Sequence, residues 1–154
     1  KQRNSLLRYF WENRTYDPDN LEVWSTQLIE LAEKIHKVRN EFVEAFEPIF
    51  LKHYEAISGN AEDVKITYRS HLNDGEFARV VAERVEKDRR TQYTNVGIHK
   101  DDLRFGINGD HPLKKFGSQG QQKTFLIALK LAQFDLVKEA TKKVPVLLLD
   151  DIFD

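Results

Sequence analysis

The feature that most constrains the fold of this chain is a run of aliphatic residues that ends in two carboxylates, Val146–Asp151. A continuous apolar run of this length is typical of a parallel strand that is buried on both faces. In open α/β sheets, ligands bind at the carboxyl ends of such strands. We therefore expect Asp150 and Asp151 to lie at the ligand-binding edge of an α/β sheet. Taken alone, the run favours a charged loop that caps a buried strand over a functional site.

A turn rich in serine, glycine and glutamine, Gly117–Lys123, lies one helix upstream of this strand. Ser118 is predicted to be the N-cap of a helix over about 121–142, and the first turn of a helix binds phosphate through its free backbone N–H groups. Gly120 permits close approach to the backbone. Gln119, Gln121 and Gln122 can donate to a phosphate or a ribose, and Lys123 adds positive charge. An ordinary capped helix start has the same composition.

The turn and the acidic strand occur in the order and at the spacing of the two halves of an ATP-binding-cassette (ABC) ATPase head. Phosphoryl transfer needs a metal on the phosphate oxygens and a group that orients the attacking water. Asp150 is predicted to hold Mg²⁺ through water, and Asp151 to polarise the nucleophile, because successive strand residues point in opposite directions. This spacing favours the functional interpretation of the two motifs over the structural one.

The rest of the sequence predicts a mixed α/β fold with two parts. Residues 1–92 are predicted to form a helical arm or lid module with a short strand and helix, and 93–154 to form the C-terminal lobe of the ATPase head. The arm begins as a hairpin of helices over about 1–14 and 21–58. Apolar residues follow a heptad pattern along the second helix. They are Trp24, Leu28, Leu31, Ile35, Val38, Phe42, Ala45 and Ile49.

Strand patterns occur at 64–68, 95–99 and 103–107, with a helix predicted over about 76–90 and a hairpin turn at Asn108-Gly109. His99 and Lys100 are candidate contacts to a nucleotide or to DNA phosphates, although a structural histidine with a carboxylate partner is equally consistent with the pattern. Arg89 and Arg90 are also candidate DNA contacts. Acidic residues are interleaved with them, which favours a plain solvated face.

The composition excludes several classes of protein and of binding site. The net charge of −1 indicates no general affinity for polyanions, and the absence of cysteine excludes disulfides and thiolate metal sites. No apolar run is long enough to span a bilayer, so we expect no membrane association and an intracellular protein. The sequence contains no Gly-x-x-x-x-Gly-Lys-Ser/Thr loop and no methionine. We therefore expect it to be a fragment of a longer protein whose N-terminal part carries the phosphate-binding loop.

At these motifs the chain resembles the RecF family of bacterial recombination mediators, which is related to SMC-type ABC ATPases. The resemblance rests on Gly117–Thr124, Ala128–Ala132 and Leu147–Asp151, and it extends over essentially all 154 residues. The segment Gly97–Asp102 resembles a Gly-Pro-His-Arg-Asp-Asp segment of the family. It has isoleucine in place of the proline and lysine in place of the arginine, so any bidentate contact from that position is in doubt.

The resemblance implies that the turn is the ABC signature, which contacts the γ-phosphate of ATP held by a second copy of the protein. It implies an ATP-dependent homodimer that clamps double-stranded DNA near gap junctions between single and double strands, with Mg²⁺ as the metal. The implied partners are RecR and, through it, RecO and RecA, in the bacterial cytoplasm during DNA repair. The complete protein is then expected to be a weak DNA-dependent ATPase, and this segment alone to be inactive.

Two other functions are consistent with the sequence. One is a different SMC-like ABC ATPase head with a short arm. The other is a non-enzymatic helical adaptor that binds a partner through the heptad hairpin, in which the Leu-rich segment is only core. A phosphate-binding loop upstream of Lys1 distinguishes the ATPases from the adaptor.

Overall fold

The structure is a computed structural model that describes residues 1–148. Its elements, in chain order, are α1 (Gln2–Asn13), α2 (Pro18–Ser58), β1 (Val64–Arg69), the 3₁₀ turn η1 (His71–Asp74), α3 (Phe77–Thr91), the 3₁₀ turn η2 (Ile98–Lys100), β2 (Asp102–Ile107), β3 (His111–Pro112), α4 (Leu113–Phe116) and α5 (Gln119–Thr141). The chain divides into two compact units. Unit 1 comprises Lys1–Asn40 and Tyr68–Asp102, and unit 2 comprises Glu41–Thr67 and the chain from Leu103.

Each unit is therefore made of two separate stretches, and α2 contributes its first part to unit 1 and its last part to unit 2. This division differs from the predicted one at 92/93, which was based on motifs rather than on packing. The assignment of the functional parts to 1–92 and 93–154 stays a prediction.

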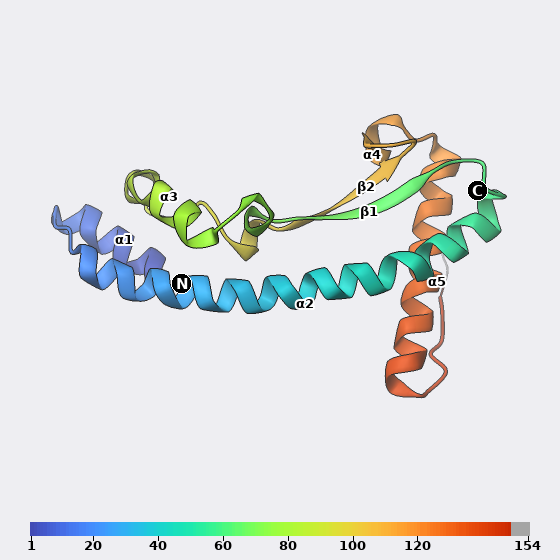
Figure 1. The fold of residues 1–154 in the computed structure, drawn as a ribbon, viewed down its shortest axis with the longest axis horizontal. Helices are drawn as coiled ribbons and strands as arrows, with labels where there is room; N and C mark the ends of the chain where they lie inside the picture. The colour runs from blue at the N-terminus through green and yellow to red at the C-terminus, as the bar shows by residue number, and fades with distance from the viewer. Residues whose placement is uncertain (149–154) are drawn as a thin grey trace. The chain divides into compact units, whose positions relative to one another are not determined.

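In unit 1, α1 lies beside the start of α2, and α1 also packs against α3 (Figure 1). Leu7 and Phe10 of α1 form one apolar cluster with Leu21 of α2. A second cluster joins α2 to α3 and to the loop after it, and consists of Ala32, Phe77, Val81 and Val96. Burial of these side chains, at about 1.5–3 kcal/mol for each large one, holds the three helices together.

Helix α2 begins and ends at residues suited to these positions. The Asp17 carboxylate accepts a hydrogen bond from the Asn20 N–H at 3.0 Å, and Pro18 occupies the first helical position, where no N–H is needed. The predicted start at residue 21 is therefore three residues late. At the other end, Gly59 adopts a φ of +67°, a conformation that glycine adopts without steric cost, as the sequence predicted.

The predicted heptad positions of α2 are not its buried face. Leu31 and Val38 are 57% and 64% exposed, and Ile35 and Phe42 are exposed as well. The buried residues form a second stripe on a different side of the helix. They include Leu21, Ala32, Val43, Phe50 and Tyr54. Two apolar stripes run along this helix, and α1, with 12 residues, is too short to pair with the heptad stripe of the 41-residue helix. The predicted hairpin of α1 and α2 is present, but the heptad positions of α2 are not its packed face, so that part of the prediction was wrong.

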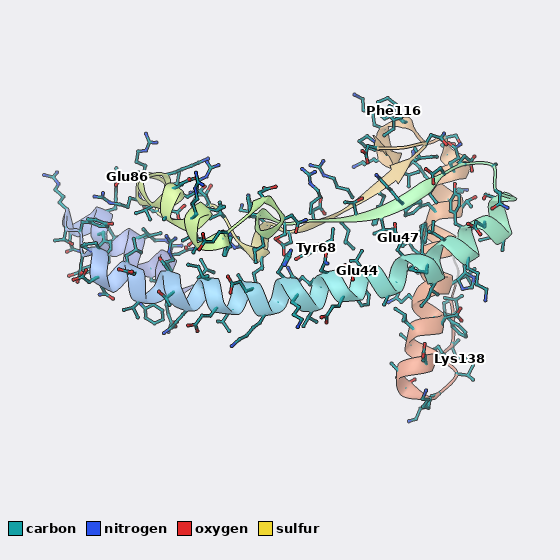
Figure 2. The ribbon with its side chains drawn as sticks, viewed as in Figure 1. Glu44, Glu47, Tyr68, Glu86, Phe116 and Lys138 are labelled. Atoms are coloured by element: carbon teal, nitrogen blue, oxygen red, sulfur yellow. The ribbon has the colours of Figure 1, made fainter. Side chains whose placement is uncertain are left out.

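Unit 2 is built on an aromatic core under a small sheet whose strand order is β1-β2-β3. Phe125 of α5 lies at the centre of the core, with ring centroids 4.5 Å from Phe50 and 5.1 Å from Phe105. The Glu47 carboxylate on α2 accepts a hydrogen bond at 2.9 Å from the N–H of Ile66 in β1 (Figure 2). Strands β2 and β3 pair antiparallel, with Ile107 opposite His111. Asn108 and Gly109, at the turn between them, both have positive φ, as the predicted hairpin requires.

Two predicted strands are not strands in the structure. The segment predicted as a strand at 95–99 is a loop that enters η2, because Asn95 is held by side-chain hydrogen bonds to Asp88 instead of a neighbouring strand. The described part of the Leu-rich segment, up to Leu148, is also not a strand. Val146 and Leu148 are 86% and 88% exposed. A buried parallel strand needs partner strands on its edges, and the described sheet supplies none beside it.

Among residues 1–148, no helix combines the length and the apolar character that a transmembrane span requires.

Candidate functional site

The turn at Gly117 is fixed by its own backbone. The Gly117 N–H donates to the Leu113 carbonyl oxygen at 2.8 Å and closes the single-turn helix α4. A Cβ at Gly117 would lie 2.8 Å from that oxygen and equally close to the Leu113 side chain. Because no side chain fits there without displacing backbone, glycine is required where the chain leaves α4 and enters the turn.

Ser118 is the N-cap of α5, as the sequence predicted. Its hydroxyl accepts a hydrogen bond from the Gln121 N–H at 3.2 Å, and the Gln121 side-chain oxygen accepts one from the Ser118 N–H at 2.7 Å. These reciprocal bonds form a capping box. Gln122 also donates its side-chain N–H to the Gly117 carbonyl at 2.8 Å. The turn is therefore held in one conformation before any ligand is present.

The sequence did not predict a role for Glu62, which anchors this turn. One Glu62 carboxylate oxygen accepts a hydrogen bond from the Gln121 side-chain nitrogen at 2.7 Å, and the other accepts one from the Tyr54 hydroxyl at 3.2 Å. Glu62 is 59 residues from Gln121 in the sequence, so no local pattern reveals the contact. Through Glu62, the last turns of α2 position the first turn of α5.

Burial is the main reason that the pKa of Tyr54 rises to about 12, and the nearby charge of Glu62 adds to the effect. This pKa is above the ordinary value of about 10, so the neutral Tyr54 hydroxyl stabilises the folded state. That contribution to the free energy of unfolding is complete below pH 10 and is lost as the pH rises toward 12. We expect Tyr54→Phe to remove part of that alkaline loss and to cost about 1 kcal/mol at neutral pH. Urea unfolding at pH 7 and between pH 10 and 12 checks this, with Tyr9→Phe as the surface control. Identical alkaline profiles for Tyr54→Phe and wild type would contradict it.

The outer face of the turn is open. Ser118, Gln119 and Gly120 are exposed, and a Cβ at Gly120 would meet nothing closer than the Ser118 hydroxyl at 4.0 Å. Gln119 and Gly120 are the first two residues of α5, so their N–H groups have no intrahelical acceptor. Lys123 lies half-buried one turn along the helix. This arrangement offers backbone donors, a hydroxyl and the positive end of a 23-residue helix to an anion.

The other predicted contact residues lie in unit 1. The His99 ring nitrogen Nε2 is 3.0 Å from the Thr94 carbonyl oxygen, so its partner is backbone and not a carboxylate. Lys100 is exposed, with its ammonium 5.8 Å from the centre of the Tyr93 ring. Arg89 bonds the Glu86 carboxylate at 2.8 Å and its guanidinium lies 3.8 Å from the centre of the Tyr16 ring. Arg90 follows it on the exposed side of α3.

Comparisons with known proteins cover nearly the whole chain. It is 52% identical over 153 residues to a "DNA replication and repair protein RecF" of Flavobacterium johnsoniae, and 41% identical over 154 residues to that of Cytophaga hutchinsonii. No protein-family profile matches. Among solved structures, the recombination mediator protein RecF-ATP of the RecFOR pathway superposes on 98% of the chain with a TM-score of 0.84 and 30% identity.

The chain belongs to the RecF family. It spans 42% of the length of the Flavobacterium johnsoniae protein, 41% of the Cytophaga hutchinsonii protein and 42% of the solved RecF chain. The predicted fold class is confirmed by this match, since helices and a small sheet of the same arrangement occur in the ATP-bound RecF structure.

In this RecF-family chain, the acidic segment after His99 has a structural partner that the sequence did not reveal. The side chain of Asp101 is almost fully buried and accepts hydrogen bonds from Arg39 at 2.7 Å and from the Tyr68 hydroxyl. Arg39 also donates to the Ile98 carbonyl at 2.8 Å. Burial and the bond to Asp101 raise the pKa of Tyr68 above its ordinary value, so the hydroxyl remains a donor. The segment that follows Gly97 is thus tied to α2 and β1 within unit 1.

The two acidic residues predicted to act on ATP, Asp150 and Asp151, lie outside the described residues. Across the described range 1–148, no group of three or more histidine, aspartate or glutamate side chains is arranged to hold a metal ion. The roles of Asp150 and Asp151 in this RecF-family chain stay predictions.

Proposed function

We propose that this chain is part of an ATP-dependent DNA recombination and repair mediator of the RecF type. Its turn Gly117–Lys123 acts as the signature that contacts the γ-phosphate of ATP bound to a second copy of the protein. The proposal is carried by the geometry of the outer face of this turn. There the capping box exposes the N–H groups of the first helical turn, which have no intrahelical acceptor, and there is open space beside Gly120. The relatives named DNA replication and repair protein RecF, and the solved RecF-ATP, support the same role.

Within this proposal, several residues of the turn bind the γ-phosphate together. The hydroxyl of Ser118 and the N–H groups of Gln119 and Gly120 donate to the γ-phosphate, while Lys123 adds positive charge. Gln121 acts differently, because both ends of its side chain are already bonded, to Ser118 and to Glu62. It holds the turn in shape and does not itself reach the nucleotide.

The remaining parts of the proposal concern ATP hydrolysis at the acidic segment and the binding of DNA. Asp150 would hold Mg²⁺ through water, and Asp151 would orient the water that attacks the γ-phosphate. ATP binding joins two copies around double-stranded DNA near a gap junction, and hydrolysis releases them, in cooperation with RecR, RecO and RecA. Lys100 is the better DNA contact in the predicted pair, since His99 uses Nε2 on the Thr94 carbonyl. A lysine ammonium group interacts with a phosphate as a point charge.

Gly120→Ala separates the fold of the turn from its function. The added Cβ points into open space, so we expect the free energy of unfolding to stay the same or to rise by up to about 1 kcal/mol. We also expect ATP-dependent self-association of the full-length protein to weaken, because the methyl group occupies the face that the phosphate approaches. Urea unfolding and sedimentation with and without ATP measure the two effects. Unchanged association in the variant would contradict the proposed contact.

A further inference from the structure

A hollow on the surface of unit 1 lies far along the sequence from the signature turn. The pocket, here called the α1–α3 pocket, has a volume of about 770 Å³ and lies between the end of α1 and the end of α3. The lining residues used below are Phe10, Trp11, Arg14, Tyr16, Arg89 and Arg90. Its size is within the range of about 300–1,000 Å³ that is typical of binding pockets.

One wall of the pocket is a fixed stack of three side chains. The Phe10 and Tyr16 rings meet edge to face, with centroids 5.6 Å apart and an interplanar angle of 81°. The guanidinium of Arg89 lies over the Tyr16 ring at 3.8 Å and is held there by its ion pair with Glu86, which Figure 2 labels on α3. The wall is therefore ordered before any ligand arrives, which lowers the entropic cost of binding.

The lining also contains an exposed apolar side chain. Trp11 is 59% exposed although it is the largest side chain in α1, and the buried residues Leu7 and Phe10 also line the pocket. Tryptophan, tyrosine and arginine around one hollow are the residue types that dominate the energetic centres of protein–protein interfaces. A large apolar side chain of a partner would remove this indole from water.

The pocket lining also carries positive charge that is not paired within the described chain. Arg14 and Arg90 line the pocket, and among the described residues neither has a hydrogen bond or an ion pair through its side chain. Arg14 ends α1 with a φ of +51°, a left-handed conformation that an arginine adopts at a cost of about 1–2 kcal/mol and a glycine does not. The two guanidinium groups can each donate a pair of hydrogen bonds to a carboxylate.

We propose that the α1–α3 pocket is a docking site for an acidic peptide segment of a partner protein, which inserts one large apolar side chain between flanking carboxylates. Charge complementarity selects this occupant, because two unpaired arginines flank an exposed indole. Duplex DNA is the less suitable occupant. The exposed indole and the apolar residues of the lining have no counterpart on a DNA backbone, whereas a peptide can supply an apolar side chain to them. This site is independent of the proposed signature turn.

Binding of a fluorescein-labelled Asp-Asp-Leu-Phe-Asp-Asp peptide to the full-length protein, followed by anisotropy, tests the site. The comparison peptide carries lysine at every aspartate position, and a short duplex DNA serves as competitor. Arg14→Gly removes one charge and relieves the left-handed backbone, so its fold is expected to be at least as stable as that of the wild type. Arg90→Ala and Trp11→Ala complete the set, and Arg84→Ala, on the same helix outside the pocket, is the matched control.

We expect the acidic peptide to bind and the lysine peptide not to bind. Arg14→Gly, Arg90→Ala and Trp11→Ala should each weaken the peptide affinity by at least about fivefold, and Arg84→Ala by less than about twofold. Equal binding of the two peptides, or equal binding by wild type and both pocket arginine variants, would overturn the proposal. It would also be overturned if the duplex bound in a manner that depends on Arg14 and Arg90 while the acidic peptide did not displace it.

Discussion

Replacement of Asp88 by alanine is expected to lower the free energy of unfolding by about 3–5 kcal/mol, a large effect for one substitution in unit 1. Asp88 is fully buried and Arg3 nearly so, and their side chains are 2.7 Å apart. Asp88 also accepts two hydrogen bonds from Asn95, at 2.9 and 2.8 Å. Loss of the carboxylate leaves a guanidinium without a counter-charge in the interior and frees the loop after α3.

The rest of the network explains why solvent cannot easily replace the lost partner. Arg3 also donates to the Thr94 hydroxyl at 2.7 Å and to the Ser25 hydroxyl at 3.1 Å, while its second terminal nitrogen, Nη2, is buried and has no partner among residues 1–148. The ion pair thus joins α1 to α3 and, through Ser25, to α2. A buried pair of this kind adds little when compared with an apolar pair, but its one-sided removal is costly.

Urea unfolding followed by circular dichroism measures this change, with Glu83→Ala as the matched control. Glu83 forms an ion pair with Arg79 at 2.8 Å on the same helix, but both side chains are exposed. Its removal is expected to cost less than about 1 kcal/mol. A loss of less than about 1 kcal/mol for Asp88→Ala as well would show that the buried network does not stabilise unit 1.

The second large effect is expected from a charge at the signature turn. Aspartate is as good an N-cap as serine, so Ser118→Asp should leave the free energy of unfolding within about 0.5 kcal/mol of wild type. Its carboxylate would face the γ-phosphate of the second copy at short range. Two charges 4 Å apart at an effective dielectric constant of about 20 interact by about 4 kcal/mol, so ATP-dependent self-association should weaken by at least about a hundredfold.

Ser118→Asn is the matched control, since asparagine also caps helices and carries no charge. Analytical ultracentrifugation of the full-length proteins with ATP distinguishes the two substitutions. We expect wild type and Ser118→Asn to associate within about tenfold of each other, and Ser118→Asp to remain monomeric. Equal association of the Asp and Asn variants would mean that no phosphate lies near residue 118.

The parts of the fold that the sequence predicts well are those set by local chemistry. The cap at Ser118 depends on residues within three positions, and the end of α2 on a glycine with positive φ. The alternation of Val64, Ile66 and Tyr68 predicts β1, because every second residue of a half-buried strand is buried. The structure confirms this strand and its burial pattern. In each case the determining interactions lie within one element.

The failures have a different physical origin, since they depend on contacts between distant residues. Helix α2 carries two apolar stripes, and only its tertiary partners determine that Ala32 and Phe50 are buried while Val38 is not. Arg3 and Asp88 are 85 residues apart, and Glu62 and Gln121 are 59 apart, so neither pair leaves a local pattern. The segment at 95–99 has strand-forming residues, but its first residue, Asn95, bonds to α3 instead, and the adjoining Thr94 bonds to α1.

The central claim, that the turn at Ser118 completes the ATP site of a second copy, is tested most directly by mixing two inactive variants. Full-length Ser118→Asp lacks a working signature, and Asp151→Asn lacks the proposed water-orienting carboxylate. If the site is shared, each mixed dimer contains one site in which both elements are intact. We expect the mixture to hydrolyse ATP in the presence of duplex DNA at a rate well above the sum of the rates of the separate variants. A rate equal to that sum, over a range of concentrations at which wild type associates, would contradict it.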